Sequence, residues 1–197
     1  MSRTQASGLA AAAIRPARPT DLPALGEFFT GLSVQARYLR FFSPITPGPS
    51  LLSLLGGGGE TTDALLATRG GVIIGHGMAA DVPGPGGART TDIGVVVADA
   101  WQHRGVGSAL VRALITGAQV RGVTSVTMDV MHGNDRALAM IKGHWPAART
   151  GRSKDCDTLC ITLADSDIER ADTGRDQARE LPRPGARPAP LATAGRG

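Results

Sequence analysis

The sequence predicts an α/β fold with a single core, and three stretches carry this prediction. Residues Ile93–Val97 form an apolar, valine-rich run of the kind that becomes a buried strand. They lead into a glycine turn, after which the apolar residues between 110 and 115 recur at the spacing of an amphipathic helix. Two further strand-like runs flank Gly70-Gly71, which is a hairpin signal. The 197 residues of the chain suffice for one such domain.

The first part of this domain predicts an edge strand followed by two helices. Ile14–Pro19 suits a short edge strand, because proline cannot donate a ladder hydrogen bond. Thr20-Asp21 is a plausible helix cap before Pro23 in the first turn. Apolar residues at helical spacing predict a helix over residues 22–32, and a second helix is expected over residues 34–42, before Pro44.

The remaining elements alternate between strand and helix. Gly56–Gly59 predicts a flexible turn. A second phosphate loop is the alternative, but such a loop needs a helix start directly after it, and none is expected here. In chain order we expect a loop at 44–50, a short apolar helical turn at 51–55, strands at 64–69, 72–80 and 91–97, a helix closed by Gly122, a strand at 125–131, a helix at 134–142 and a last strand at 158–163.

The two ends of the chain differ in composition from its middle. Residues 1–13 are rich in alanine and predict a disordered leader before a folded domain at residues 14–164. Residues 165–197 are charged at first, where a weak helix could form. From Leu181 they are rich in Pro, Ala, Gly and Arg, which predicts a disordered tail.

Composition narrows the function classes. The formal net charge is +4, with Lys142 and Lys154 as the only lysines, and aromatic residues make up 4% of the chain. A nucleic-acid surface needs a basic stripe with interleaved aromatics, so nucleic acid is not expected as the main partner. No stretch is long enough to span a membrane. Cys156 and Cys160 are too far apart on one strand for a disulfide, which favours free thiols and a cytoplasmic location.

The glycine turn, which we define as Gln102–Ser108, is the strongest candidate for a binding site. A glycine turn that feeds the start of a helix leaves several backbone N–H groups unpaired, and the helix dipole adds partial positive charge there. This combination predicts an anion site for a pyrophosphate. The four histidines and two cysteines have no metal-ligand spacing, so no metal is expected.

The pattern Gln102-x-x-Gly105-x-Gly107, its strand and helix, and Asn134 about 30 residues later resemble the Gcn5-related N-acetyltransferases, or GNAT family. The family signature is Gln/Arg-x-x-Gly-x-Gly/Ala, and the resemblance covers about residues 14–163. It implies a mixed, mostly antiparallel central sheet with helices on both faces. It also implies a V-shaped split between the fourth and fifth strands.

Residues 32–42 and 92–102 are similar to the acetyltransferase domains of bacterial protein-lysine acetyltransferases. The resemblance implies acetyl transfer from acetyl-CoA, as cosubstrate, to a primary amine by direct attack. The acceptor amine is either a protein lysine, which would make the activity lysine acetylation, or a small molecule, and the protein is a monomer or homodimer. No membrane partner and no metal are implied.

The same resemblance assigns the cosubstrate site. Glycine at two positions of the turn lets the pyrophosphate approach the backbone without a Cβ in the way. The fourth strand holds the pantetheine amides by sheet-like hydrogen bonds, and Asn134 binds the pantetheine arm, caps a helix, or does both. The implied cosubstrate residues are Val95, Val96, Val97, Gln102, Arg104, Gly105, Val106, Gly107, Ser108 and Asn134.

Asp92 is the candidate general base. Relatives of the lysine-acetyltransferase type place a Glu at the start of this strand, and Asp92 is one methylene shorter, so it would act through a water. The alternative is a strand-end carboxylate that faces solvent or pairs with Arg89. Many relatives protonate the leaving thiolate with a Tyr, whose matching position here is about Ile141, so solvent would supply this proton.

Arg37 and Arg40 lie where the family has its substrate-facing helix, and they could steer an acidic substrate. Tyr38 and the two Phe residues after it are expected in the core. Two alternatives remain open beside the enzyme. The fold could serve as a catalytically weak CoA sensor or partner-binding module, or the Arg/Pro-rich tail could tether nucleic acid.

Overall fold

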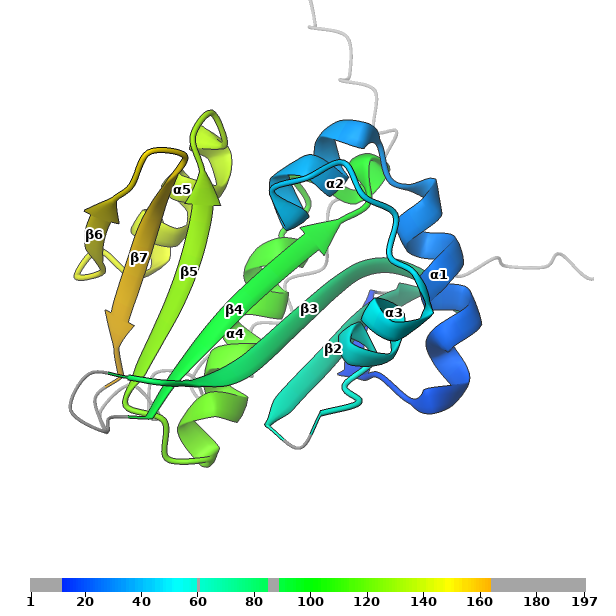
Figure 1. Cartoon of the computed structure of the whole chain (residues 1–197), viewed down its shortest axis with the longest axis horizontal. Helices are drawn as coiled ribbons and strands as arrows, with labels where there is room; N and C mark the ends of the chain where they lie inside the picture. Colours follow the sequence, from blue (N-terminus) through cyan, green and yellow to red (C-terminus); the bar gives the residue numbers. More distant parts are fainter. Residues whose placement is uncertain (1–11, 60, 85–88, 164–197) are drawn as a thin grey trace, which may run out of the picture.

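The computed structural model describes residues 12–59, 61–84 and 89–163 (Figure 1). Residues 1–11 of the leader expected at 1–13, and the whole tail expected at 165–197 with its weak helix, lie outside the described residues, as does most of the loop after residue 83. Ala13 belongs to β1 and not to a leader. The elements are β1 (Ala13–Pro16), η1 (Pro19–Asp21), α1 (Leu22–Gly31), α2 (Val34–Phe41), α3 (Pro49–Leu55), β2 (Thr62–Arg69), β3 (Val72–Pro83), β4 (Arg89–Val97), η3 (Asp99–Trp101), α4 (Val106–Val120), β5 (Ser125–Met131), α5 (Asp135–His144), β6 (Arg149–Arg152) and β7 (Cys156–Thr162).

The strands form one seven-stranded sheet in the order β1-β2-β3-β4-β5-β7-β6. Every neighbouring pair is antiparallel except β4 and β5, which run parallel. β1, with its proline, lies at one edge as predicted, and β2 and β3 form the hairpin expected around Gly70-Gly71. The mixed, mostly antiparallel sheet is therefore confirmed.

β4 and β5 separate soon after they begin (Figure 1). Their pairing joins Thr90 to Ser125, Thr91 to Val126 and Asp92 to Thr127, and within the described residues it ends there. β4 continues to pair with β3 as far as Val97. The sheet is thus split into two arms by a V that opens toward the carboxyl ends of β4 and β5, as predicted.

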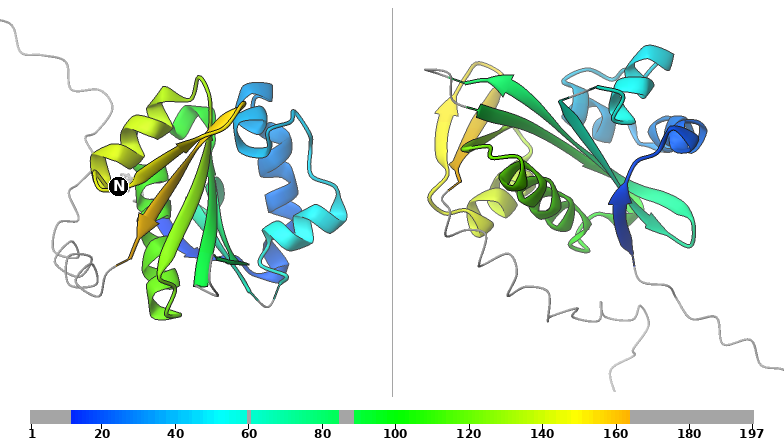
Figure 2. Two further views of the ribbon diagram at one scale, coloured as in Figure 1. Left: turned by 60° about the vertical axis from the view of Figure 1, so that its left-hand side comes forward. Right: turned by 90° about the horizontal axis from the view of Figure 1, so that it is seen from below.

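Helices cover both faces of the sheet (Figure 2). On one face, α4 packs with β4, β5 and β7 in a core that includes Leu114, Val126 and Leu159. On the other face, α1, α2 and α3 bury Leu25 and Phe29 against the arm that ends with β4. These three helices do not extend over β5, β6 and β7 (Figure 1). In the part of the chain that the structure describes, no helix therefore covers this face of the second arm beside the split.

Local signals explain most element boundaries. Ser33 caps α2, since its hydroxyl accepts a hydrogen bond from the Ala36 N–H at 3.1 Å. Gly122 follows α4 with a φ of 74°, in the left-handed region that favours glycine after a helix. Asp21 stands before α1 but does not cap it, because its carboxylate binds the Arg15 guanidinium at 2.7 Å.

Several expectations need correction. The apolar run at 51–55 belongs to a full helix that starts at Pro49, and β6 had no signal in the sequence because all four residues are exposed. Tyr38 and Phe42 are exposed at 42% and 39% of their surface, so they are not core residues, while Phe41 packs against the core.

Both cysteines are free, as expected. Among the described residues, no helix has the length and hydropathy needed to cross a membrane.

Candidate active site

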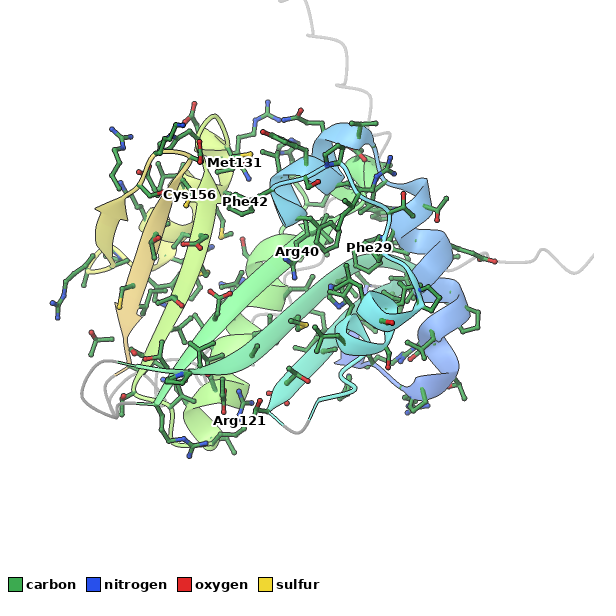
Figure 3. All side chains as sticks on the ribbon, viewed as in Figure 1. Phe29, Arg40, Phe42, Arg121, Met131 and Cys156 are labelled. Atoms are coloured by element: carbon green, nitrogen blue, oxygen red, sulfur yellow. The ribbon has the colours of Figure 1, made fainter. Side chains whose placement is uncertain are left out.

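A cavity of about 1020 Å³ occupies the split between β4 and β5. Its walls are the end of α2, the length of β4, the glycine turn, the far part of β5 and the start of α5. In Figure 3, Arg40 lies in front of β4, and Phe42 lies at the gap between α2 and the end of β5 that carries Met131. Most of the residues expected from the sequence to form a site therefore meet in one cavity.

The glycine turn presents a helix start to this cavity. Gly105 has a φ of 79° and precedes α4 as its N-cap residue, yet no side chain caps the helix. The first N–H groups of α4 are therefore available to a ligand, as a phosphate site requires. Val106 is buried and anchors the helix to the core, while Gly107 and Ser108 line the cavity. A Cβ on Gly107 would meet only Val97, at 3.7 Å, so the fold does not itself require glycine there.

Two side chains of the turn are held by the protein itself. The Gln102 amide donates to the Val97 carbonyl at 3.1 Å and so fixes the turn to the end of β4. The Arg104 guanidinium lies over the Trp101 ring, with its Cζ 5.0 Å from the ring centre, and Arg104 does not line the cavity. Arg104 can therefore serve a phosphate through its backbone N–H, whereas its side chain is engaged with the tryptophan.

The start of α5 closes the far side of the cavity. Asn134 caps this helix, because its side-chain oxygen accepts from the Ala137 N–H at 3.4 Å, and it also lines the cavity. Arg136 Nη1 donates to His103 Nε2 at 2.8 Å, which links α5 to the glycine turn across the mouth of the split. Nothing in the sequence indicates this link, because Arg136 and His103 lie 33 residues apart in the chain.

β4 offers one unpaired backbone edge to the cavity. Val95, Val96 and Val97 pair with β3 on one side, while the edge toward β5 has no strand partner among the described residues. Their side chains pack into the cores on the two faces of the sheet, and all three residues line the cavity. Such an edge can bind an extended amide-containing ligand as another strand would.

Asp92 stands where β4 and β5 part. Its Oδ1 accepts a hydrogen bond from the Thr127 hydroxyl at 3.1 Å. Burial and the nearby charge of Asp129 raise the pKa of Asp92 above its ordinary value of 3.8, while Thr127 and the charge of Arg40 oppose this rise. Arg89 does not pair with it, because Arg89 lies 3.6 Å from Asp81 instead. A carboxylate with a raised pKa in a slot is suited to accept a proton.

Asp129 is a second carboxylate that the sequence did not single out. It lines the same cavity from β5, and the Thr158 hydroxyl on β7 donates to its Oδ1 at 2.6 Å. Alternation along β5 places Thr127 and Asp129 on one face of the sheet, away from the buried Val126 and Met128. That alternation was visible in the sequence, but nothing there placed β5 beside Asp92.

The two arginines of α2 make different contacts. Arg37 Nη1 donates to the carbonyls of Leu32 at 2.6 Å and Thr30 at 3.2 Å, so it caps the end of α1 and does not line the cavity. Arg40 does line the cavity, and its guanidinium lies on the backbone of Gly94. We call Arg40, Asp92 and Asp129 the charged wall of the cavity.

The resemblance implies a position near residue 141 for the tyrosine acid of many relatives, and residue 141 is an isoleucine. Ile141 is buried in the core beside α4, and Tyr38 lies on another helix with its side chain exposed. Among the described residues, no group of His, Cys, Asp and Glu side chains could hold a metal ion.

A family model provides the decisive comparison. The model of the acetyltransferase (GNAT) family matches residues 38–144, which is more than half of the chain. The chain belongs to the GNAT acetyltransferase family. The matched segment includes the glycine turn, both strands of the split and all three residues of the charged wall. Membership in this family supports acetyl transfer to amine acceptors as the general activity.

Solved GNAT structures share the fold. The GNAT domain of S. lividans PAT, a Streptomyces protein acetyltransferase, is 24% identical with a TM-score of 0.70, covering 78% of this chain and 92% of that one. A GCN5-related N-acetyltransferase from Kribbella flavida is 23% identical, with a TM-score of 0.64 and coverage of 78% and 98%. The yncA protein of Salmonella typhimurium, solved with its cofactor acetyl-CoA, is 18% identical, with a TM-score of 0.64 and coverage of 79% and 96%. No curated protein matches the sequence.

Proposed function

We propose that this protein is an acetyl-CoA-dependent N-acetyltransferase that acetylates a primary amine, either a protein lysine or a small molecule. One observation carries the proposal. The unpaired edge of β4 leads from the glycine turn at one end of the slot to the Asp92 carboxylate at the other. An anion site, an amide-binding edge and a base are thereby aligned along one strand, in the order that pyrophosphate, pantetheine and thioester require.

The proposed cosubstrate contacts follow from these groups. The N–H groups of residues 104–108 would hold the pyrophosphate, helped by the dipole of the 15-residue helix α4. The edge at Val95–Val97 would bind the pantetheine amides through the groups that remain beside the Val97 carbonyl, which already accepts from Gln102. Asn134 would contact the same arm from the opposite wall. When bound, acetyl-CoA supplies an activated acetyl group as a thioester.

Asp92 is the proposed general base. Only a neutral amine is nucleophilic, so Asp92 would take a proton from the acceptor ammonium, directly or through one water. The amine then forms the C–N bond to the acetyl carbonyl carbon as the C–S bond breaks. The departing thiolate takes its proton from solvent, since Ile141 occupies the position of the family tyrosine and a thiol has an ordinary pKa of about 8.5.

A second candidate function is a CoA-binding module without useful turnover. The buried Ile141 and the short Asp92 favour it, because one family acid is missing and the base reaches less far than a glutamate would. This module would use the same glycine turn and β4 edge. The two candidates therefore differ only in what happens at the charged wall.

Two measurements on the full chain separate these functions. Calorimetry measures acetyl-CoA affinity, and a thiol-release assay measures turnover over a panel of lysine peptides and small amines. Transfer predicts both binding and acceptor-dependent thiol release. Binding without thiol release from any acceptor would favour the module, and the absence of binding would reject both functions.

A further inference from the structure

Arg40 is the most unusual charged residue in the cavity. Its Nε is buried, and the side chain forms no hydrogen bond or ion pair with any residue that the structure describes. Burial lowers the pKa of the guanidinium below its ordinary value, and the charge of Asp92 opposes this shift. A guanidinium stays protonated in proteins, so an uncompensated positive charge is held at the cavity wall.

The position of this charge depends on Gly94. A Cβ built on Gly94 would lie 2.5 Å from Cζ of Arg40 and 2.6 and 2.7 Å from its two terminal nitrogens. Only glycine therefore allows the guanidinium to lie against β4, between Asp92 and the proposed pantetheine edge. The Phe41 ring, whose centre is 5.1 Å from Cζ, supports the guanidinium from its own helix.

No described carboxylate forms an ion pair with Arg40. Asp92 is near enough to influence it, but no N···O distance between the two side chains is within 4 Å, so they form no ion pair. The buried His76 near Arg40 also carries no charge that could balance the guanidinium. Burial lowers the pKa of His76 to about 4, so this side chain is neutral at physiological pH.

The charged wall thus presents one free guanidinium and two carboxylates to the same cavity. An acceptor ammonium is attracted to Asp92 and Asp129. A planar carboxylate matches the two-pronged fork of an arginine. A doubly charged phosphate would be repelled by the two aspartates, which favours a singly charged carboxylate. The cavity of about 1020 Å³ must also hold the pantetheine arm, which leaves only part of its volume for the acceptor.

Building on the proposed acetyl transfer, we infer that the acceptor is a small amino acid, whose carboxylate is bound by Arg40 while its ammonium faces Asp92 and Asp129. Arg40 is then a specificity-determining residue, and Gly94 is the residue that leaves room for it. This assignment selects the small-molecule acceptor over a lysine side chain, which has no carboxylate of its own.

The test compares matched acceptors on the full-length protein. A panel of α- and ω-amino acids is assayed by thiol release, each beside its own carboxamide, together with an end-blocked lysine peptide that has only neutral neighbours. We expect at least one amino acid to exceed its carboxamide in kcat/KM by about 10- to 100-fold, as one charge-assisted contact allows. Equal or better use of the carboxamides and the peptide would overturn the inference.

Variants locate the effect. Arg40→Gln should bring the ratio of acid to carboxamide close to one, and Arg40→Lys should retain part of it. Gly94→Ala should also lower the ratio, because the new methyl group displaces the guanidinium while the charge remains. Arg37→Gln is the matched control, since Arg37 caps α1 outside the cavity. Thermal unfolding verifies that each variant is folded.

An equal loss for every acceptor in Arg40→Gln would contradict the inference, because Arg40 would then only position Asp92. A binding measurement keeps the inference testable if turnover is absent. Calorimetry of the amino acids with CoA-saturated protein should show binding that Arg40→Gln removes, and no binding of any of them would overturn the inference. Thiol release from neutral amines alone would leave the proposed acetyl transfer intact while rejecting the amino acid.

Discussion

The glycine turn and the charged wall face the same cavity but are built in opposite ways. The turn is one continuous segment, and it offers backbone N–H groups whose direction is set by the start of α4. The charged wall takes one side chain each from α2, β4 and β5, which only the folded sheet brings together. With the roles that we propose, pyrophosphate binding is specified by one local segment, whereas acceptor choice depends on long-range packing.

The largest effect should come from filling the glycine turn. Gly107→Val places an isopropyl group where the phosphate must approach the backbone, and losing several charge-assisted bonds corresponds to an affinity loss of at least about 1000-fold. Calorimetry with acetyl-CoA measures it. Gly143→Val is the matched control, because Gly143 is also in a helix and a Cβ there meets nothing within 4 Å. Normal affinity in Gly107→Val would mean that the pyrophosphate lies elsewhere.

His76 tests the support behind the charged wall. Its folded-state pKa of about 4 is below the ordinary 6.5, so the unfolded chain binds more protons between these values. The free energy of unfolding should therefore fall by about 3 kcal/mol through this group as pH drops from 6.5 to 4. His76→Gln can still donate to the Leu55 carbonyl and should remove this dependence, as urea unfolding at several pH values would show.

The exposed His144 provides the control for that experiment, and His144→Gln should leave most of the pH dependence in place. An unchanged pH dependence in His76→Gln would mean that His76 is hydrated or charged in the folded protein. The inference that Arg40 lies beside a neutral His76 would then be wrong.

Asp129→Asn should have a smaller effect and act only on the acceptor side. Removing this charge lowers the pKa of Asp92 toward its ordinary value, so the acidic limb of the pH profile of kcat/KM should move to lower pH. At neutral pH we expect about a tenfold lower kcat/KM, because a cationic acceptor loses one attractive charge. Asp155→Asn, on the β6–β7 turn, should change neither quantity. An acidic limb that stays in place would show that Asp92 is not the titrating base.

The smallest effect is expected from Ser33→Ala, which removes a contact between α2 and the segment before the glycine turn. The Ser33 hydroxyl caps α2 and donates to Asp99 Oδ1 at 2.8 Å, and Asp99 lies in η3 just before the glycine turn. Loss of the cap should cost about 1 kcal/mol in urea unfolding. Acetyl-CoA affinity should change less than about twofold, with Ser50→Ala as control. A larger loss of affinity would show that the two regions are coupled.

Most of the fold followed from sequence because its signals are local. The valine run of β4, the helix spacing of α4 and the hairpin glycines each lie within a few residues, and all three appear where expected. β6 was not predicted, because its residues are all exposed and show no alternation of apolar and polar side chains. Tyr38 and Phe42 were misplaced because an exposed aromatic at the rim of a cavity has the same sequence pattern as one in a core.

The positions of some residues in the candidate site could be predicted from the sequence, and those of others could not. The glycine turn and Asp92 could be placed because their position along one strand–turn–helix unit is enough to locate them. Arg37 and Arg40 could not be told apart, since only the packing of α2 decides that one caps α1 and the other reaches Gly94. Asp129 had no signal at all, because its role depends on the strand beside it.

The most direct test of the central claim is one variant measured in two ways. Asp92→Asn keeps the size and most hydrogen bonds of the side chain but removes the base, so thiol release with the best acceptor should fall by about 100- to 10,000-fold. Calorimetry of the same variant should give an acetyl-CoA affinity within about twofold of the wild type. Retained turnover, or a parallel loss of affinity, would contradict the assignment of binding to the glycine turn and of catalysis to the charged wall.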